Sequence, residues 1–354
     1  MQIARLLLIY APSLDYSETM KAAQVHRCAK IETNPVVIDD IELPRPGSGQ
    51  VLVRVDAAGV CRSNLNMVEG DWLAGGVPPK FPIIPGHEMA GTVTELGPDV
   101  ESVSVNQRVG LQPLWTSCGN CDLCLTGGEY WCPKNKILGE TVDGCFAEYI
   151  VGYEGHVYPL PSNVDAVAAA PLFCAGVTAY GAVKKAAIQP GMKVAVFGVG
   201  GVGHMAVQFA KLFGADVYAV ARSDLHQALA EELGAIPVDG NRDPVGELTR
   251  LGKMDVSILF APSSEAAIQA IRSTRVRGTV VMGAPAGIDA FPFDEEKRIL
   301  GTLVGGRKAM REVVALAAAG KIRAVTETHR LDEANQMLKN LKNGEVKARA
   351  VLVP

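Results

Sequence analysis

The chain has 354 residues, of which 48% are hydrophobic and 20% are charged, and its formal net charge is −4. This composition is ample for two folded domains and excludes an intrinsically disordered chain. Because no basic stripe and no run of eighteen apolar residues is present, we expect neither nucleic acid nor a membrane among the partners. We therefore expect a soluble cytoplasmic protein.

The first part of the chain is predicted to be rich in β-strands. Residues 1–19 are interpreted as an N-terminal extension, because Met20 is a natural start. From 20 to 170, short apolar runs alternate with segments rich in proline and glycine, as expected for strands joined by turns. Three of these runs are predicted strands, at residues 36–38, 50–55 and 90–96.

Four cysteines lie within fifteen residues inside this β-rich part: Cys118, Cys121, Cys124 and Cys132. Four thiolates this close in sequence can enclose one tetrahedral Zn²⁺ and leave no position for water, which predicts a structural zinc site. An iron–sulfur cluster is an alternative, since ferredoxins have similar spacings. Disulfides are another alternative, but they need an oxidising compartment, and the N-terminus offers no convincing secretion signal.

The second part of the chain alternates strands and helices. Predicted strands lie at 193–197, 216–220, 254–260 and 279–282, and predicted helices at 202–213 and 225–233. This alternation indicates a doubly wound parallel sheet. A helix at 311–319 and a strand at 348–353 follow, and we expect them to return to the first domain. The predicted domains are therefore 20–170 with 311–354, and 171–310.

A glycine-rich turn follows the strand at 193–197 and has the pattern G-x-G-x-x-G; its residues are Gly198, Gly200, Gly201, Val202 and Gly203. The pattern is weak alone, but here it follows a buried strand and opens an amphipathic helix, the context of a dinucleotide site. There the glycines permit the tight turn, the approach of a pyrophosphate and close packing of helix on strand. The alternative is a tight turn that binds no ligand.

The end of the next strand is informative about the coenzyme. NAD sites usually carry an acidic residue there, whereas this strand ends near Ala221 and is followed by Arg222 and Ser223. A guanidinium suits a 2′-phosphate, so NADP is favoured and NAD remains possible. We expect Asp224 to cap the following helix. The alternative for Arg222 is a solvated surface charge.

Three further candidate ligands are dispersed along the chain: Cys61, His87 and Cys174. Two thiolates and one imidazole form a zinc site with one open position, where the metal acts as a Lewis acid on a substrate oxygen. Spacing does not prove that the three meet in space, and buried cysteines and a satisfied core histidine are the alternative. We assign Cys28 and Cys145 to that structural class.

The chain resembles the zinc-dependent medium-chain alcohol dehydrogenases. The motifs that carry this resemblance are Gly86-His87-Glu88, the cysteine quartet, residues 174–178 and the turn at 198–203. The resemblance extends from Met20 to Pro354. The run at 200–205 is also similar to the cinnamyl-alcohol branch of the family, which uses NADP.

The resemblance implies a GroES-like β-rich catalytic domain and a Rossmann coenzyme domain, with the active site in the cleft between them. It implies that Cys61, His87 and Cys174 hold a catalytic zinc with Glu88 close behind it, so that each chain carries two zinc ions. It further implies that Ser63 hands on the alcohol proton, that Thr178 touches the nicotinamide and that Arg307 contacts the coenzyme phosphates.

The resemblance also implies a homodimer or homotetramer, for which Leu303-Val304 is an apolar edge. Trp72 and Trp115 match positions that shape the alcohol pocket, and ordinary packing aromatics are the alternative. The implied reaction is reversible hydride transfer between an alcohol and NAD(P), with a polyol or an aromatic alcohol as alternative substrates.

Two positions depart from the family pattern. Asn64 stands where the family has an aspartate that accepts the second ring proton of the ligand histidine. We expect the amide oxygen of Asn64 to accept that proton without bringing a charge, and hypothesise weaker zinc retention. Asn66 replaces a histidine that often ends the proton relay. These departures leave open a zinc-stabilised nucleotide-binding protein with weak activity.

Overall fold

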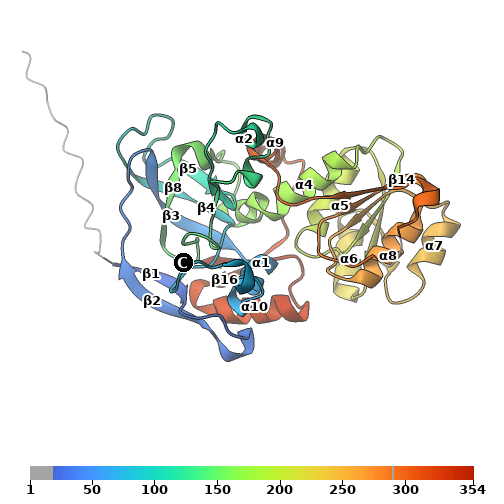
Figure 1. Ribbon diagram of the computed structural model, residues 1–354, viewed down its shortest axis with the longest axis horizontal. Helices are drawn as coiled ribbons and strands as arrows, with labels where there is room; N and C mark the ends of the chain where they lie inside the picture. The colour runs from blue at the N-terminus through green and yellow to red at the C-terminus, as the bar shows by residue number, and fades with distance from the viewer. Residues whose placement is uncertain (1–18, 289–290) are drawn as a thin grey trace, which may run out of the picture.

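The computed structural model describes residues 19–288 and 291–354, and the predicted extension, apart from Thr19, lies outside these residues. The chain forms two lobes side by side (Figure 1). The first lobe is built on a seven-stranded sheet in the order β16-β17-β3-β4-β5-β9, with β8 also paired to β3. The strands are β3 (Gln50–Gly59), β4 (Met89–Leu96), β5 (Arg108–Leu111), β8 (Tyr149–Tyr153), β9 (Val157–Pro159), β16 (Thr326–Arg330) and β17 (Arg349–Val353).

Smaller elements surround this sheet. An antiparallel ribbon of β1 and β2 lies at its edge, and β6 pairs with β7 beside the cysteine quartet. The bounds are β1 (Thr19–Val25), β2 (Val36–Glu42), β6 (Leu114–Thr116), β7 (Lys136–Ile137), α1 (Arg62–Glu69), α2 (Asp122–Leu125), α3 (Ala166–Ala169) and α10 (Ala334–Asn343).

The second lobe is the doubly wound parallel sheet that the sequence predicts. Its order is β12-β11-β10-β13-β14-β15, and every neighbouring pair is parallel. The strand order reverses between β10 and β13, the point at which open α/β sheets bind ligands. The elements are β10 (Lys193–Phe197), β11 (Asp216–Ala221), β12 (Ile236–Asp239), β13 (Met254–Leu259), β14 (Thr274–Met282), β15 (Arg298–Gly301), α5 (Gly203–Leu212), α6 (Asp224–Glu232), α7 (Pro244–Arg250) and α8 (Ser264–Ser273).

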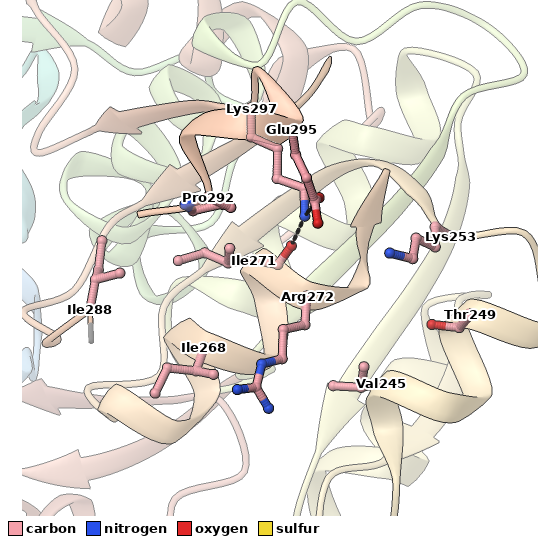
Figure 2. A pocket seen from close by; sticks show the side chains of 10 residues that line it. All are labelled: Val245, Thr249, Lys253, Ile268, Ile271, Arg272, Ile288, Pro292, Glu295 and Lys297. Atoms are coloured by element: carbon pink, nitrogen blue, oxygen red, sulfur yellow. Dashed lines mark hydrogen bonds and ion pairs between the residues drawn. The ribbon is translucent and has the colours of Figure 1, made fainter. Parts of the chain in front are cut away.

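A pocket of about 470 Å³ lies in the second lobe beside α7 and α8 (Figure 2). Its one buried charge is the ammonium of Lys297, which pairs with Glu295 and donates to the carbonyl oxygen of Ile271 at 2.7 Å. The charge is thus neutralised within the chain. None of the residues that line this pocket belongs to the predicted metal or coenzyme sites.

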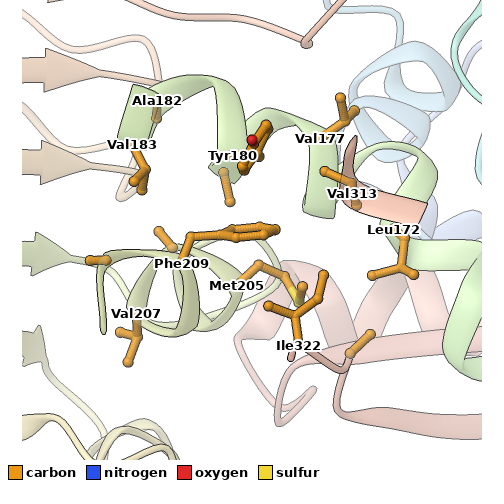
Figure 3. Packing of buried hydrophobic residues seen from close by; sticks show 14 of the residues in the cluster. Leu172, Val177, Tyr180, Ala182, Val183, Met205, Val207, Phe209, Val313 and Ile322 are labelled. Carbon is orange, nitrogen blue, oxygen red and sulfur yellow. The ribbon is translucent and has the colours of Figure 1, made fainter. Parts of the chain in front are cut away.

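Helix α4 (Ala175–Lys185) is packed on α5 by large apolar side chains (Figure 3). The rings of Tyr180 and Phe209 have centroids 5.1 Å apart, and Met205 and Val313 belong to the same buried cluster. Residue Cys174 stands at the N-cap of α4, so this packing fixes the position of its thiol relative to the glycine turn that opens α5.

Helix α9 (Arg307–Ala318) begins four residues before the predicted start at 311. The prediction followed apolar periodicity, and the first turn, which includes the half-buried Arg307 and the exposed Lys308, lacks that signal. The last strand, β17, pairs with β3 through Val351 and Leu352, so the C-terminal segment lies in the sheet of the first lobe. The domain limits at 170 and 310 stay a prediction.

Within the described residues no single helix is long and apolar enough to cross a membrane. One bent pair, Ala166–Phe173 with Ala175–Lys185, passes a test of length and composition. Most of its residues are buried in the core of the protein.

Candidate metal and coenzyme site

Four dispersed residues meet in one buried cluster: Cys61, His87, Glu88 and Cys174. One ligand atom from each lies within 4.8 Å of the others, and the sulfur atoms of Cys61 and Cys174 are 4.0 Å apart. Cys61 follows β3, His87 and Glu88 directly precede β4, and Cys174 precedes α4. Sheet pairing and the packing of α4 therefore assemble a donor set of two thiols and an imidazole, which fits a divalent zinc ion.

Two residues of the first turn of α1 line this cluster. The hydroxyl of Ser63 donates to Cys61 Sγ at 3.2 Å and lies 3.3 Å from His87 Nε2. The amide oxygen of Asn64 accepts the backbone N–H of Cys61 at 3.0 Å, while its nitrogen lies 3.4 Å from His87 Nδ1. The expectation that the oxygen of Asn64 accepts from His87 is therefore wrong, because that oxygen points to the N-cap of α1 and the amide nitrogen is the atom near His87 Nδ1.

Electrostatic interactions within the cluster favour a thiolate on Cys61. The hydrogen bond from Cys174 lowers the pKa of Cys61 well below its usual value, against the effect of burial, and His87 lowers it further. Burial lowers the pKa of His87, but the hydrogen bond and charge of Cys61, with the charges of Glu140 and Glu88, raise it to about 9. A thiolate is the form of cysteine that binds a metal.

Sequence analysis missed Arg349, which joins the metal cluster to the glycine turn. Its guanidinium and the Glu88 carboxylate form an ion pair in which both side chains are almost fully buried. Burial raises the pKa of Glu88 to about 7, against the lowering effect of the charge of Arg349. A side chain at Gly201 would start 2.6 Å from Arg349 Nη1. An arginine within the apolar run of the last strand was the available sequence signal.

The glycine turn has the geometry expected of a dinucleotide site. Gly198 has φ +90°, and a Cβ on Gly203 would lie 1.8 Å from the carbonyl oxygen of Gly198, so helix and strand touch there. At Gly200 the space is open, with only His226 Nε2 at 3.9 Å. Open backbone at the N-terminal end of α5 is where a pyrophosphate approaches closely.

A pair of variants separates the two roles of these glycines. Gly203→Ala is expected to destabilise the protein by about 1–3 kcal/mol, because the new methyl group overlaps a backbone oxygen. Gly200→Ala is expected to keep the thermal midpoint and to weaken coenzyme binding at least ~10-fold, because its methyl group occupies open space at the turn. Thermal unfolding and coenzyme titration measure the two effects. Equal stability loss in both variants would contradict this assignment.

The end of β11 carries no carboxylate. Ala221 is its last residue, Arg222 is exposed, and the backbone oxygen of Arg222 accepts from Asn241 Nδ2 at 2.5 Å. Ser223, not Asp224, is the N-cap of α6, because the Ser223 hydroxyl accepts from the backbone N–H of His226. The prediction for Asp224 was wrong by one residue, since serine competes equally well for an N-cap.

Other predicted coenzyme and pocket residues lie as follows. Thr178 is buried in the first turn of α4, and Arg307 donates to the carbonyl oxygen of Gly155 at 2.5 Å. Contacts of these two with a coenzyme stay predictions. Trp115 donates to the carbonyl oxygen of Val151 at 2.7 Å, and Trp72 packs against the core of the first lobe, as in the packing alternative.

The cysteine quartet forms a second cluster, at α2 and the turn after it. All four sulfur atoms lie within 4.8 Å of one another, with Cys121–Cys124 at 3.5 Å and Cys118–Cys124 at 3.9 Å. Tetrahedral coordination with Zn–S bonds of about 2.3 Å places sulfur atoms about 3.8 Å apart, so the quartet fits the metal. These separations are far above the ~2.05 Å of a disulfide.

The chain is similar to known proteins over most of its length. A profile described as "Alcohol dehydrogenase GroES-like domain" matches residues 47–162, and one described as "Zinc-binding dehydrogenase" matches 201–319. An alcohol dehydrogenase of Geobacillus stearothermophilus is 40% identical over 341 residues, which cover 94% of this chain and 98% of that protein.

Solved structures of alcohol dehydrogenases have the same fold as this chain. The alcohol dehydrogenase from the hyperthermophilic archaeon Aeropyrum pernix has a TM-score of 0.87 and 37% identity, covering 94% of this chain and all of that one. The cobalt- and zinc-bound thermostable alcohol dehydrogenase from Pyrobaculum aerophilum has a TM-score of 0.85 and 31% identity, with coverages of 95% and 100%.

Proposed function

Because the chain belongs to the zinc-dependent medium-chain alcohol dehydrogenases, we propose that Cys61, His87 and Cys174 form the reaction centre of this oxidoreductase. The single observation that supports this assignment is the meeting of these three residues in one buried cluster, although they come from separate elements. The cysteine quartet would hold a second, structural zinc.

The residues of the site would have separate roles in the reaction. Cys61, His87 and Cys174 would hold a zinc ion, which would supply Lewis-acid polarisation of the alcohol or carbonyl oxygen. Ser63 is near enough to the cluster to take the alcohol proton, because its hydroxyl lies between Cys61 and His87. Asn66 is no base, so that proton passes to water or to the coenzyme ribose. Thr178 would lie against the nicotinamide of a bound coenzyme, which would supply hydride transfer.

The proposal is tested with the purified protein. Turnover of a panel of primary, secondary, polyol and aromatic alcohols is followed by the absorbance of the reduced coenzyme, and zinc is counted per chain. Two zinc ions and turnover support the assignment. One zinc ion and no turnover would contradict it and would favour a zinc-stabilised nucleotide-binding protein.

We also propose a preference for NADP, supported by the end of β11. Ala221 brings no carboxylate to repel a 2′-phosphate, and the exposed guanidinium of Arg222 has no ion-pair partner among the described residues. Near it, Ser223 Oγ lies 2.7 Å from His226 Nδ1. Membership of the cinnamyl-alcohol branch stays a prediction.

The coenzyme preference predicts a selective effect of Arg222→Ala. The KM for NADPH is expected to rise about 10–100-fold, because a charge-assisted hydrogen bond to phosphate contributes about 1.5–3 kcal/mol. The KM for NADH should not change. Arg250→Ala removes another exposed arginine of the same lobe and serves as the control. An equal rise for both coenzymes would show that Arg222 does not read the 2′-phosphate.

The assembly and the compartment are also proposals. A homodimer or homotetramer is supported by β15, an edge strand followed by Leu303, which is 42% exposed. Unprotected edge strands tend to pair with another chain. A cytoplasmic location is supported by eight cysteines that are all free of disulfides, as expected of a reducing compartment.

A further inference from the structure

The Nδ1 side of the His87 ring faces two side chains, Asn64 and Glu140. Asn64 Nδ2 lies 3.4 Å from His87 Nδ1, and Glu140 Oε1 lies 3.8 Å from the same atom. The other ring nitrogen, Nε2, is on the thiol side, because Ser63 Oγ lies 3.3 Å from it and 3.2 Å from Cys61 Sγ. A metal at the cluster would therefore be bound through Nε2.

An imidazole bound through Nε2 carries its proton on Nδ1 and needs an acceptor there. Asn64 is not that acceptor, because its oxygen points to the backbone N–H of Cys61 at 3.0 Å and the atom of Asn64 beside His87 Nδ1 is the amide nitrogen. Turning the amide would place its NH₂ group against the N–H of Cys61. Either way a donor faces a donor, and Asn64 leaves one of the two N–H groups without a partner.

We propose that Glu140 is the positioning residue that accepts the Nδ1 proton of His87, in place of a carboxylate at position 64. The proposal depends on the assignment of His87 as a zinc ligand made under Proposed function. The Glu140 side chain is 15% exposed, and among the described residues its carboxylate has no hydrogen bond or ion pair other than that with His87.

Backbone packing places Glu140 over His87. Gly139 has φ +69°, and a Cβ there would lie 2.5 Å from the carbonyl oxygen of Gly86, the residue before His87. A Cβ on Gly144 would lie 2.2 Å from the same oxygen, which also accepts the N–H of Cys145 at 3.1 Å. The loop between β7 and β8 thus contacts the backbone of Gly86 at Gly139 and Gly144, and these contacts hold Glu140 next to His87.

The test measures zinc retention, not activity. Enzyme with its full zinc content is dialysed against a chelator, and the zinc content per chain is followed with time. The kinetic phase of zinc loss that is absent from Cys174→Ala belongs to the catalytic ion. Glu140→Gln is expected to lose this ion about 10-fold faster, because the neutral amide oxygen that remains accepts a hydrogen bond more weakly than a carboxylate, while the structural zinc is unaffected. Gln has the shape of Glu, so the fold is retained.

Rescue makes the test specific. Asn64→Asp in the Glu140→Gln background is expected to restore most of the retention, because an aspartate has one oxygen for the N–H of Cys61 and another for His87 Nδ1. Asp143→Asn is the control, since Asp143 lies in the same loop, accepts the backbone N–H of Ile84 at 3.1 Å, and pairs with Lys80 at the surface. It should change retention far less than Glu140→Gln.

Four results would overturn the proposal. An unchanged rate of zinc loss in Glu140→Gln, or no rescue by Asn64→Asp, would show that Glu140 does not accept the Nδ1 proton of His87. The assignment of His87 as a zinc ligand would not be affected. Retained zinc with lost turnover in Glu140→Gln would show that the carboxylate contacts substrate instead. A wild-type enzyme with one zinc per chain would contradict the assignment of Cys61, His87 and Cys174 as zinc ligands. Because this measurement uses the wild-type enzyme, it separates a failure of the proposed function from a failure of the role of Glu140.

Discussion

Replacing Cys174 by alanine is expected to lower kcat/KM for alcohol oxidation at least ~10³-fold and to reduce the zinc content from two ions per chain to one. The thiol is one of the two soft donors in the cluster, and the sulfur of Cys61, the other one, lies 4.0 Å from it. Loss of a Lewis acid removes several kcal/mol of transition-state stabilisation, and each 1.36 kcal/mol is tenfold in rate. Metal analysis and steady-state kinetics measure both effects.

The fold should survive this change. Cys174 makes no side-chain hydrogen bond to cap α4, and alanine is tolerated at that buried position. Cys28→Ala is the matched control, because Cys28 lies outside both clusters and its thiol donates to the carbonyl oxygen of Met67 at 3.2 Å. If Cys174→Ala kept two zinc ions and full turnover, the reaction centre would have to be sought elsewhere.

The second large effect is expected from Cys124→Ala in the cysteine quartet. Cys124 lies within α2, where alanine is a good helix former, so the change removes a ligand and little else. The segment at 117–132, which contains the cysteine quartet, exposes Leu125 and Trp131 and lacks an apolar core of its own. Binding of structural zinc contributes about 10–16 kcal/mol to the folding of small zinc-binding peptides. Without a ligand, the segment at 117–132 is therefore expected to unfold locally.

Limited proteolysis followed by mass spectrometry measures this opening. Cleavage between 117 and 132 should accelerate ~10²-fold or more, because cleavage follows the population of the open form. Leu125→Ala is the control, since Leu125 is 71% exposed in the same helix and binds no metal. Unchanged cleavage with two zinc ions would contradict the structural role, and iron in place of zinc would favour the iron–sulfur alternative.

Features with a local geometry could be predicted from the amino-acid sequence. The cysteine quartet is closed by fifteen residues of chain, and the glycine turn needs only the strand before it and the helix after it. The alternation of strands and helices likewise predicted the parallel sheet, and the six strands are found in the doubly wound order. Such patterns are readable because spacing along the chain sets the distances between the groups.

Contacts between dispersed residues could not be predicted in this way, because they depend on how the elements pack. The pairing of β3 with β4 brings Cys61 to His87, and the packing of α4 adds Cys174. Arg349 reaches Glu88 because β17 pairs with β3. The contact between Glu140 and His87 depends on a loop pressed onto Gly86 by backbone packing. These contacts join segments whose separation in sequence carries no distance information, so sheet register and helix packing alone determine them.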